Sequence, residues 1–366
     1  MPASSPLRPT SQRAGQSAIR VLICDDSAVM RAAVARVLEG DPAIEVVARA
    51  ANGAQALEAV KRQPVDVVVL DIEMPVMDGL AALPLLLRAA PRLRVVMAST
   101  LTTRGADVTL RALRLGAADY VAKPSATGEY SSEAFRHDLL GKVKALGGRR
   151  PLSPAIGAPA ERPLPPMRPR PLAAPLLLAI GASTGGPQAL FALMAALGSA
   201  VPVPVVVTQH MPAAFTPILA EHMTRAGQLP CAEAREDEAL LPGQVYLAPG
   251  DRHLLIERTE DGPRVRLATT PPVNFCRPSV DPMLESAAVS YDGRVLVAML
   301  TGMGRDGLDG TRRVIAAGGV AIAQDEASSV VWGMPGAIAR AGLCHAVLAL
   351  AEIAPRLLDL LLVTRA

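Results

Sequence analysis

Short apolar runs alternate with segments of helical periodicity from residue 19 to residue 146. We predict strands at residues 20–23, 45–50, 65–70, 94–98 and 119–122, and helices at 28–38, 54–62, 79–88, 108–115 and 132–146. A run that is apolar throughout is typical of a strand buried on both faces. Successive β/α units of this kind predict a doubly wound domain, in which helices cover both sides of a parallel sheet.

The same alternation returns in the second half of the chain. We predict strands at residues 176–180, 203–208, 294–300 and 320–323, and helices at 188–197, 215–225, 282–290 and from about 310. Between the second and third of these strands, the runs 245–250, 254–257 and 264–267 predict a hairpin-rich insertion. The pattern therefore predicts a second doubly wound α/β domain with a parallel sheet.

A proline-rich stretch separates the two predicted domains. Nine prolines lie between residues 151 and 175, with arginines among them, so this segment cannot form a core and favours extended conformations. It predicts a semi-rigid spacer. The N-terminus is rich in Ser, Pro and Arg, and we expect it to be disordered. The predicted organisation is a tail (1–18), a first domain (19–146), a linker (147–172) and a second domain (173–364).

The bulk composition excludes several classes of protein. A length of 366 residues fits two domains, and a net charge of +3 is too small for a nucleic-acid-binding surface. The four cysteines are scattered without a C-x-x-C pair, which indicates reduced thiols. No apolar run reaches the length of a membrane span. We expect a cytoplasmic monomer with no nucleic-acid partner and no insertion into a membrane.

Charged and hydroxyl side chains follow the predicted strands of the first domain. They are Asp25, Asp26, Asp71, Ser99 and Lys123. In a parallel sheet these strand ends meet at one edge, where crowded carboxylates repel each other unless a cation such as Mg²⁺ lies among them. A lysine and a hydroxyl beside them suit a phosphoryl group, and an aspartate can be the nucleophile toward phosphorus. Solvated acidic loops are the alternative, which the agreement of all these strand ends disfavours.

Residues 19–146 resemble a response-regulator receiver domain, which has a flavodoxin-like fold. The resemblance rests on Asp25-Asp26-Ser27, on Asp71-Ile-Glu-Met-Pro75 with Met77-Asp-Gly79, on Ser99-Thr100 and on Lys123-Pro124. It implies that a partner histidine kinase phosphorylates Asp71. It also implies a Mg²⁺ site formed by Asp26, Asp71 and the carbonyl of Glu73, with Asp25 nearby. Ser99 and Lys123 would bind the phosphoryl oxygens, and Thr100 is the alternative to Ser99.

In the second domain, Ser183 lies on a glycine-rich turn between a strand and a helix. Gly181-Ala-Ser-Thr-Gly185 matches the G-x-S-x-G pattern of a nucleophile elbow, although a serine that only caps the helix is the alternative. The pattern lacks the G-x-G-x-x-G of a dinucleotide-binding fold, and the next strand ends in Gln209-His210 instead of an acidic residue. These two departures argue against a nicotinamide cofactor.

His210 and Asp306 each follow a predicted strand at the same sheet edge as Ser183, and they are candidates for a base and its orienting acid. Asp306 could instead cap the next helix, and Asp309 and Asp325 compete with it for the acid role. Exposed amides in the glycine-rich turn, for example that of Met303, are candidate oxyanion donors. The chain order Ser, His, Asp differs from that of α/β-hydrolases.

Residues 173–364 resemble the Rossmann-like catalytic domain of chemotaxis protein-glutamate methylesterases, the CheB family. The matching segments are 181–186, 208–212, 247–250, 271–281, 300–307 and 323–335. The resemblance implies hydrolysis of glutamyl methyl esters on methyl-accepting chemoreceptors, with release of methanol. Ser183, His210 and Asp306 would be catalytic, with oxyanion support from Met303 and Thr184, and no cofactor for the ester hydrolysis. Deamidation of receptor glutamine is a further activity that the same chemistry would allow.

Two other classes of function stay open from the residues alone. One is a receiver-controlled binding module with an inert Ser183 site, and the other is a receiver joined to a different esterase or amidase. A DNA-binding regulator is disfavoured, because the second half has neither a helix-turn-helix pattern nor a basic stripe. For the methylesterase, we expect the unphosphorylated receiver to cover the sheet edge that carries Ser183.

Overall fold

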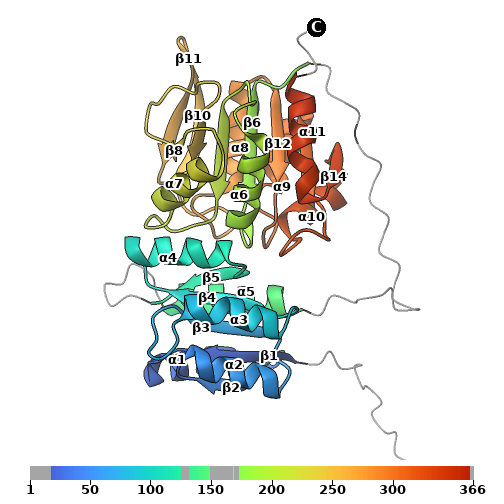
Figure 1. Cartoon of the computed structure of the whole chain (residues 1–366). Coiled ribbons are helices and arrows are strands. Elements are labelled where there is room, and N and C mark those ends of the chain that lie inside the picture. The colour runs from blue at the N-terminus through green and yellow to red at the C-terminus, as the bar shows by residue number, and fades with distance from the viewer. Residues whose placement is uncertain (1–17, 125–131, 149–167, 169–172, 363–366) are drawn as a thin grey trace, which may run out of the picture.

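The computed structural model describes residues 18–124, 132–148, 168 and 173–362. Residues 1–17 of the predicted tail and most of the predicted linker lie outside the described residues. The described part forms two α/β domains stacked one above the other (Figure 1). Among the described residues, no helix combines the length and the apolar content that crossing a bilayer requires.

The first domain is built on a five-stranded parallel sheet in the order β2-β1-β3-β4-β5. One set of buried side chains joins this sheet to α1 and α5, and another joins it to α2, α3 and α4, so helices cover both faces. The elements are β1 (Ile19–Cys24), α1 (Ala28–Glu39), β2 (Ile44–Ala50), α2 (Gly53–Arg62), β3 (Val67–Asp71), α3 (Gly79–Ala89), β4 (Arg94–Ser99), α4 (Thr103–Arg114), β5 (Asp119–Ala122) and α5 (Ser132–Gly147).

The second domain has a seven-stranded parallel sheet in the order β14-β13-β12-β6-β7-β9-β8. Its elements are β6 (Leu177–Ala182), α6 (Gly186–Leu197), β7 (Val205–Gln209), α7 (Thr216–Ala226), β8 (Cys231–Glu233), β9 (Val245–Leu247), β10 (His253–Thr259), β11 (Gly262–Ala268), α8 (Val280–Ser290), β12 (Val295–Met299), α9 (Leu308–Ala316), β13 (Val320–Gln324), α10 (Met334–Arg340), β14 (Ala346–Leu348) and α11 (Leu350–Leu362). The predicted pair of parallel-sheet domains is confirmed.

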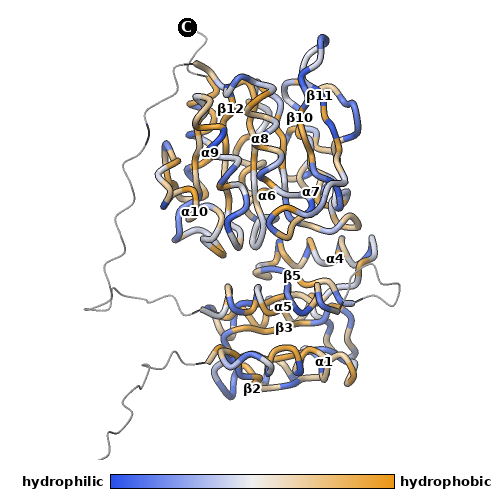
Figure 2. The backbone as a smooth tube through the Cα atoms, turned by 180° about the vertical axis from the view of Figure 1, so that it is seen from behind, coloured by the Kyte–Doolittle hydropathy of each residue, from blue (hydrophilic) through white to orange (hydrophobic). Residues whose placement is uncertain are grey.

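Strands β10 and β11 form a separate antiparallel hairpin within the predicted insertion. The predicted run 245–250 is not part of this hairpin, because β9 pairs in parallel with β7 and β8 and belongs to the main sheet. The tip of this hairpin is hydrophilic and points away from the first domain (Figures 1 and 2). The base of the hairpin packs on α8 through buried residues such as Leu254 and Ile256.

Several elements differ from the sequence prediction. Helix α4 begins five residues before the predicted start, because the Thr102 side chain accepts a hydrogen bond from the Gly105 amide and caps it. The sequence prediction also lacked β14, α10 and α11. The last of these is a 13-residue helix with Pro355 inside it, and it packs on α6.

The two domains meet through α4, β5 and α5 of the first domain and the lower edge of the second domain (Figure 1). The Tyr120 ring stacks on the Phe215 ring with a centroid distance of 4.7 Å. His222 Nε2 lies 3.0 Å from Asp107 Oδ1. One connected set of buried apolar side chains therefore extends through both domains.

Gly141 of α5 faces the glycine-rich turn of the second domain. A Cβ atom at this position would lie 3.0 Å from the Met303 Cε atom, which is closer than most such contacts in proteins. The absence of a side chain at Gly141 thus allows α5 to approach this turn.

We predict that Gly141→Leu separates the two domains, because the added side chain would occupy the space of Met303. Small-angle X-ray scattering of the full chain should show a larger radius of gyration for this variant than for the wild type. Arg136→Leu, at an exposed position of the same helix, is the matched control and should leave the radius unchanged.

Candidate active site

Ser183 lies directly after β6, on the turn that leads into α6. Its amide donates to the carbonyl of Thr301 at 3.0 Å, and the His210 amide donates to the carbonyl of Ala182 at 3.2 Å. These backbone bonds tie together the ends of β6, β7 and β12, which are neighbours in the sheet. The residue that caps α6 is Gly185, in the left-handed region, so Ser183 is not the helix cap.

His210 and Asp306 are in direct contact. The distance from His210 Nε2 to Asp306 Oδ2 is 2.7 Å, and the side chains are 13% and 2% exposed. Asp306 also accepts hydrogen bonds from donors in the segment before α8, at the start of α8 and in its own turn. These donors are the side chains of Asn274 and Ser279 and the amides of Val280, Asp281 and Gly307.

The surroundings fix the charge of this carboxylate. Burial alone would raise the pKa of Asp306, but the contact with His210 and the hydrogen bonds from its donors hold it well below its usual range. Burial raises the pKa of the neighbouring Asp281 to about 6, and the charge of Asp306 adds to this rise. Asp306 is therefore ionised at neutral pH and is a stable partner for an imidazolium.

The other acidic residues weighed in the sequence lie in different contacts. Asp309 pairs with Arg312 on the exposed face of α9. Asp325 accepts from the amide and the hydroxyl of Ser328. Asp306 also does not cap α9, whose first turn is preceded by Gly307. Ser279 precedes α8 at the cap position, but its hydroxyl donates to Asp306 at 2.7 Å instead of capping the helix.

Met303 and Thr184, which the sequence analysis assigned to oxyanion support, lie in different surroundings. Met303 follows Gly302, which is so close to Ser183 that an added Cβ would lie 2.9 Å from the Ser183 Cβ. Within the described residues, the Met303 amide has no hydrogen-bond partner, so it is available to a ligand. Burial raises the pKa of Asp119 in β5. The charge of Lys142 is the main effect that opposes this rise, and a hydrogen bond from the Thr184 side chain adds to it. Thr184 is thus in contact with the first domain.

Three contacts of the site were missed in the sequence. Gln209 Nε2 donates to the carbonyl of Ser183 at 3.0 Å, and Asn274 Nδ2 donates to Asp306 at 3.0 Å. Cys276 Sγ lies 3.4 Å from His210 Nδ1. Burial lowers the pKa of His210, but the contacts with Cys276 and Asp306 outweigh this effect and raise it. Gln209 adjoins the histidine and could have been found by position, whereas the other two depend on a loop fold that the pattern does not encode.

The first domain gathers its charged strand-end residues as predicted. Carboxylate oxygens of Asp25, Asp26 and Asp71 lie within 4.8 Å of one another, a geometry that fits a hard divalent cation such as Mg²⁺. Lys123 Nζ lies 2.8 Å from Asp25 and 2.7 Å from Asp71. Burial raises the pKa of Asp71, and Lys123 opposes this rise.

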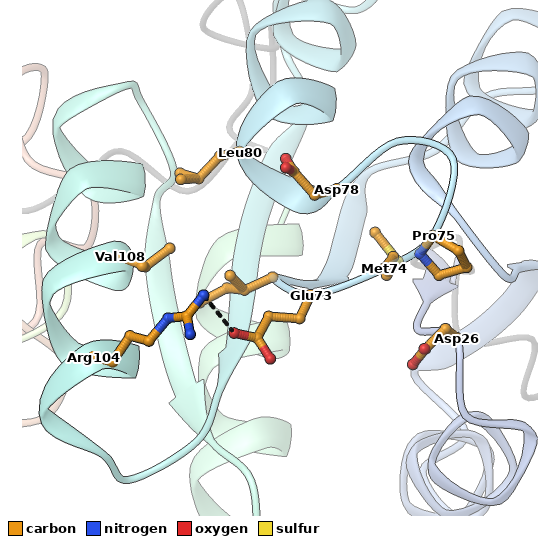
Figure 3. A pocket seen from close by; sticks show the side chains of 9 residues that line it. Asp26, Glu73, Met74, Pro75, Asp78, Leu80, Arg104 and Val108 are labelled. Carbon is orange, nitrogen blue, oxygen red and sulfur yellow. Dashed lines mark ion pairs between the residues drawn. The ribbon is translucent and has the colours of Figure 1, made fainter.

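A pocket of about 670 Å³ opens beside this cluster, between the loop after β3 and helix α4 (Figure 3). Glu73 lines it, and its side chain points toward Arg104 at 3.9 Å instead of into the cluster. Ser99 is buried and accepts a hydrogen bond from Thr109 of α4 at 2.7 Å. Thr100 is exposed and contacts Thr102. The Ser99 hydroxyl therefore faces α4 in this structure.

Comparisons with known proteins agree with both resemblances. Residues 178–357 match the family model of the CheB methylesterase, and residues 21–133 match that of the response regulator receiver domain. The protein-glutamate methylesterase/protein-glutamine glutaminase of Azospirillum brasilense is 50% identical over 376 aligned residues, which cover 97% of this chain and 95% of that protein. A protein of the same name from Rhodospirillum centenum is 51% identical and covers 93% of each chain.

The second domain is also similar to a solved structure. The Thermotoga maritima CheB methylesterase catalytic domain is 37% identical, with a TM-score of 0.50, and the match covers 51% of this chain and 100% of that domain.

We predict that Asp26→Asn weakens Mg²⁺ binding to the full chain at least tenfold, because it removes one of the charged ligands. Isothermal titration calorimetry measures the binding. Asp78→Asn is the matched control, since Asp78 lines the same pocket but caps α3, and asparagine caps equally well. Equal loss in both variants would mean that general negative charge binds the ion and that the three-carboxylate cluster does not.

Proposed function

Because the chain belongs to the CheB family of protein-glutamate methylesterases and carries a receiver domain, we propose that it hydrolyses glutamyl methyl esters on chemoreceptors, releasing methanol, under control of phosphorylation. The observation that supports this proposal best is the His210–Asp306 contact at the end of β7, beside Ser183 at the end of β6. The relatives are also named glutaminases, so hydrolysis of receptor glutamine at the same site is part of the proposal.

In the proposed reaction, Ser183 Oγ attacks the ester carbonyl while His210 takes the serine proton. Asp306 occupies Nε2 of the ring, so Nδ1 is the nitrogen that is left to accept this proton. The oxygen of the tetrahedral intermediate would bind the Met303 amide. His210 then returns the proton to the departing methoxide, which leaves as methanol, and the glutamyl ester of Ser183 forms.

Water completes the proposed cycle. His210 takes a proton from water as the water attacks the acyl-enzyme, and it returns that proton to Ser183 as glutamate leaves. Asp306 stabilises the imidazolium in both halves of the reaction. Because these steps use only the side chains of Ser183, His210 and Asp306, we propose that ester hydrolysis needs no cofactor.

For the receiver, we propose that Asp71 accepts a phosphoryl group from a histidine kinase. Asp25 and Asp26 would hold Mg²⁺ with Asp71 and the carbonyl of Glu73, and the bound ion would neutralise negative charge during the transfer. Lys123 would pair with the phosphoryl oxygens, and Ser99 would turn toward them from its contact with Thr109.

The docked arrangement supports control by occlusion. The α4–β5–α5 face of the receiver lies against the sheet edge that carries Ser183, and Met303 packs against Gly141 of α5. If Ser99 turns toward a phosphoryl group, its bond to Thr109 of α4 breaks, and the docked face is repacked. We propose that this repacking opens the site. Action on the cytoplasmic part of chemoreceptors, as a monomer, belongs to the same proposal.

We predict that Ser183→Ala and His210→Ala each lower methanol release from methylated receptor membranes by several orders of magnitude, because the residues act as one unit. Asp306→Asn should cost less than either, since the nucleophile and the base remain. Asp309→Asn is the matched control and should keep wild-type turnover, because Asp309 lies in an exposed ion pair. A silent Asp306→Asn beside a crippled Asp309→Asn would refute the assignment of the acid.

We predict that removal of residues 1–146 raises basal methanol release and abolishes the response to a small-molecule phosphodonor. Asp71→Asn in the full chain should stay low and unresponsive, because it cannot carry the phosphoryl group. EDTA should abolish the response of the full chain and leave the fragment fully active. A fragment no more active than the unphosphorylated full chain would exclude simple occlusion.

A further inference from the structure

Both ring nitrogens of His210 are engaged in this structure. Asp306 binds Nε2 at 2.7 Å, and the Cys276 sulfur lies 3.4 Å from Nδ1. Among the described residues, no hydrogen bond joins the Ser183 hydroxyl to the ring. The nitrogen that the proposed reaction reserves for the serine proton therefore faces a thiol.

The contact between the Cys276 sulfur and His210 Nδ1 competes with the serine for this nitrogen. A neutral ring that donates through Nε2 to Asp306 has its lone pair on Nδ1, and a thiol is a weak donor to such a lone pair. If the proton moves to the ring, Nδ1 carries it and the sulfur accepts. With the shared proton on either atom, this contact must break before Nδ1 can take a proton from Ser183, which costs about one hydrogen bond.

The loop that carries Cys276 is well defined. Val273 and Cys276 exchange backbone hydrogen bonds of 2.9 and 3.1 Å, and Asn274 and Phe275 between them both have positive φ, as in tight hairpin turns. Asn274 anchors this turn by donating to Asp306. The turn thus contacts both members of the His210–Asp306 pair.

The same turn reaches the receiver. The Phe275 ring lies 5.9 Å from the ring of His137 on α5, measured between centroids, and is tilted by 36°. The Phe275 side chain is 92% exposed, so this contact with α5 lies at the rim of the interface and buries little surface. This contact involves α5 and is separate from the packing of α4 and β5 against the sheet edge that carries Ser183.

We propose that Cys276 is a positioning residue of the general base, which in the docked chain holds His210 Nδ1 away from Ser183. The proposal rests on the methylesterase function proposed above. Phe275 is next to Cys276 in the chain, so its contact with α5 is the route by which the docked receiver would also bias the base. Undocking frees the turn, and Nδ1 becomes available to the serine.

The test is methanol release from methylated receptor membranes by the unphosphorylated full chain. Cys276→Ala should raise kcat about two- to tenfold, the factor that corresponds to one hydrogen bond, with KM unchanged because the thiol touches the base and does not cover the site. Cys276→Ser should stay near the wild type, since a hydroxyl can also donate to Nδ1. Cys231→Ala is the matched control, because Cys231 is also partly exposed and lies on β8 away from the triad.

Treatment with a phosphodonor tests whether the receiver influences the contact between Cys276 and His210. The ratio of kcat between Cys276→Ala and the wild type should fall toward one, because undocking already frees the base in the wild type. An unchanged ratio would overturn this part of the proposal. No rise in kcat for a folded Cys276→Ala, or an equal rise in Cys276→Ser, would overturn the role of the thiol.

A measurement without turnover separates this proposal from the methylesterase function. In the full chain labelled with ¹⁵N-histidine, the His210 Nδ1 resonance should move in Cys276→Ala and stay in place in Cys231→Ala. A resonance that does not move refutes the contact with Cys276 even if a variant is less stable. Wild-type methanol release no higher than that of Ser183→Ala, with a resonance that moves, would refute the methylesterase function and leave the contact established.

Discussion

The buried carboxylate of Asp306 is the interaction on which the active edge of the second domain depends. A charge that is only 2% exposed is costly unless donors surround it. Here the donors come from the residue after β7, from the segment before α8 and the first turn of α8, and from the turn before α9. Satisfying one carboxylate therefore brings together the imidazole, the start of α8 and the glycine-rich turn beside Ser183. The geometry of the site follows from the solvation requirement of a single side chain.

The parts of the structure that were predictable from the sequence are those that follow from periodicity and from strand ends. Apolar runs located the central strands, and the rule that parallel strands end at one edge brought Asp25, Asp71 and Lys123 together, as it did His210 and Asp306. The start of α4 was missed because Thr102 caps a turn that has no apolar stripe. The turn around Cys276 was missed because its residues have positive φ without a glycine. Such a conformation is imposed by tertiary contacts such as the bond from Asn274 to Asp306.

The arrangement of the two domains was not predictable from the pattern either. The side chains at the interface, such as Tyr120, Phe215 and His222, each fit a buried position within their own domain. Their partners across the interface become apparent only when both domains are in place. Gly141 illustrates the point, since a glycine within a helix weakens it locally and is explained here by the approach of Met303. Function in this chain thus depends on positions that local propensity disfavours.

The docking of receiver and catalytic domain within one chain has a consequence for the cell that contains it. An association between separate molecules strengthens as their concentration rises, whereas one within a chain depends only on the tether and the two faces. The fraction of enzyme in the closed state is therefore the same in a cell with few copies and in one with many. Cells that express different amounts of the protein differ in total catalytic activity. The equilibrium between docked and undocked domains is the same in all of them, because it is a property of the single chain.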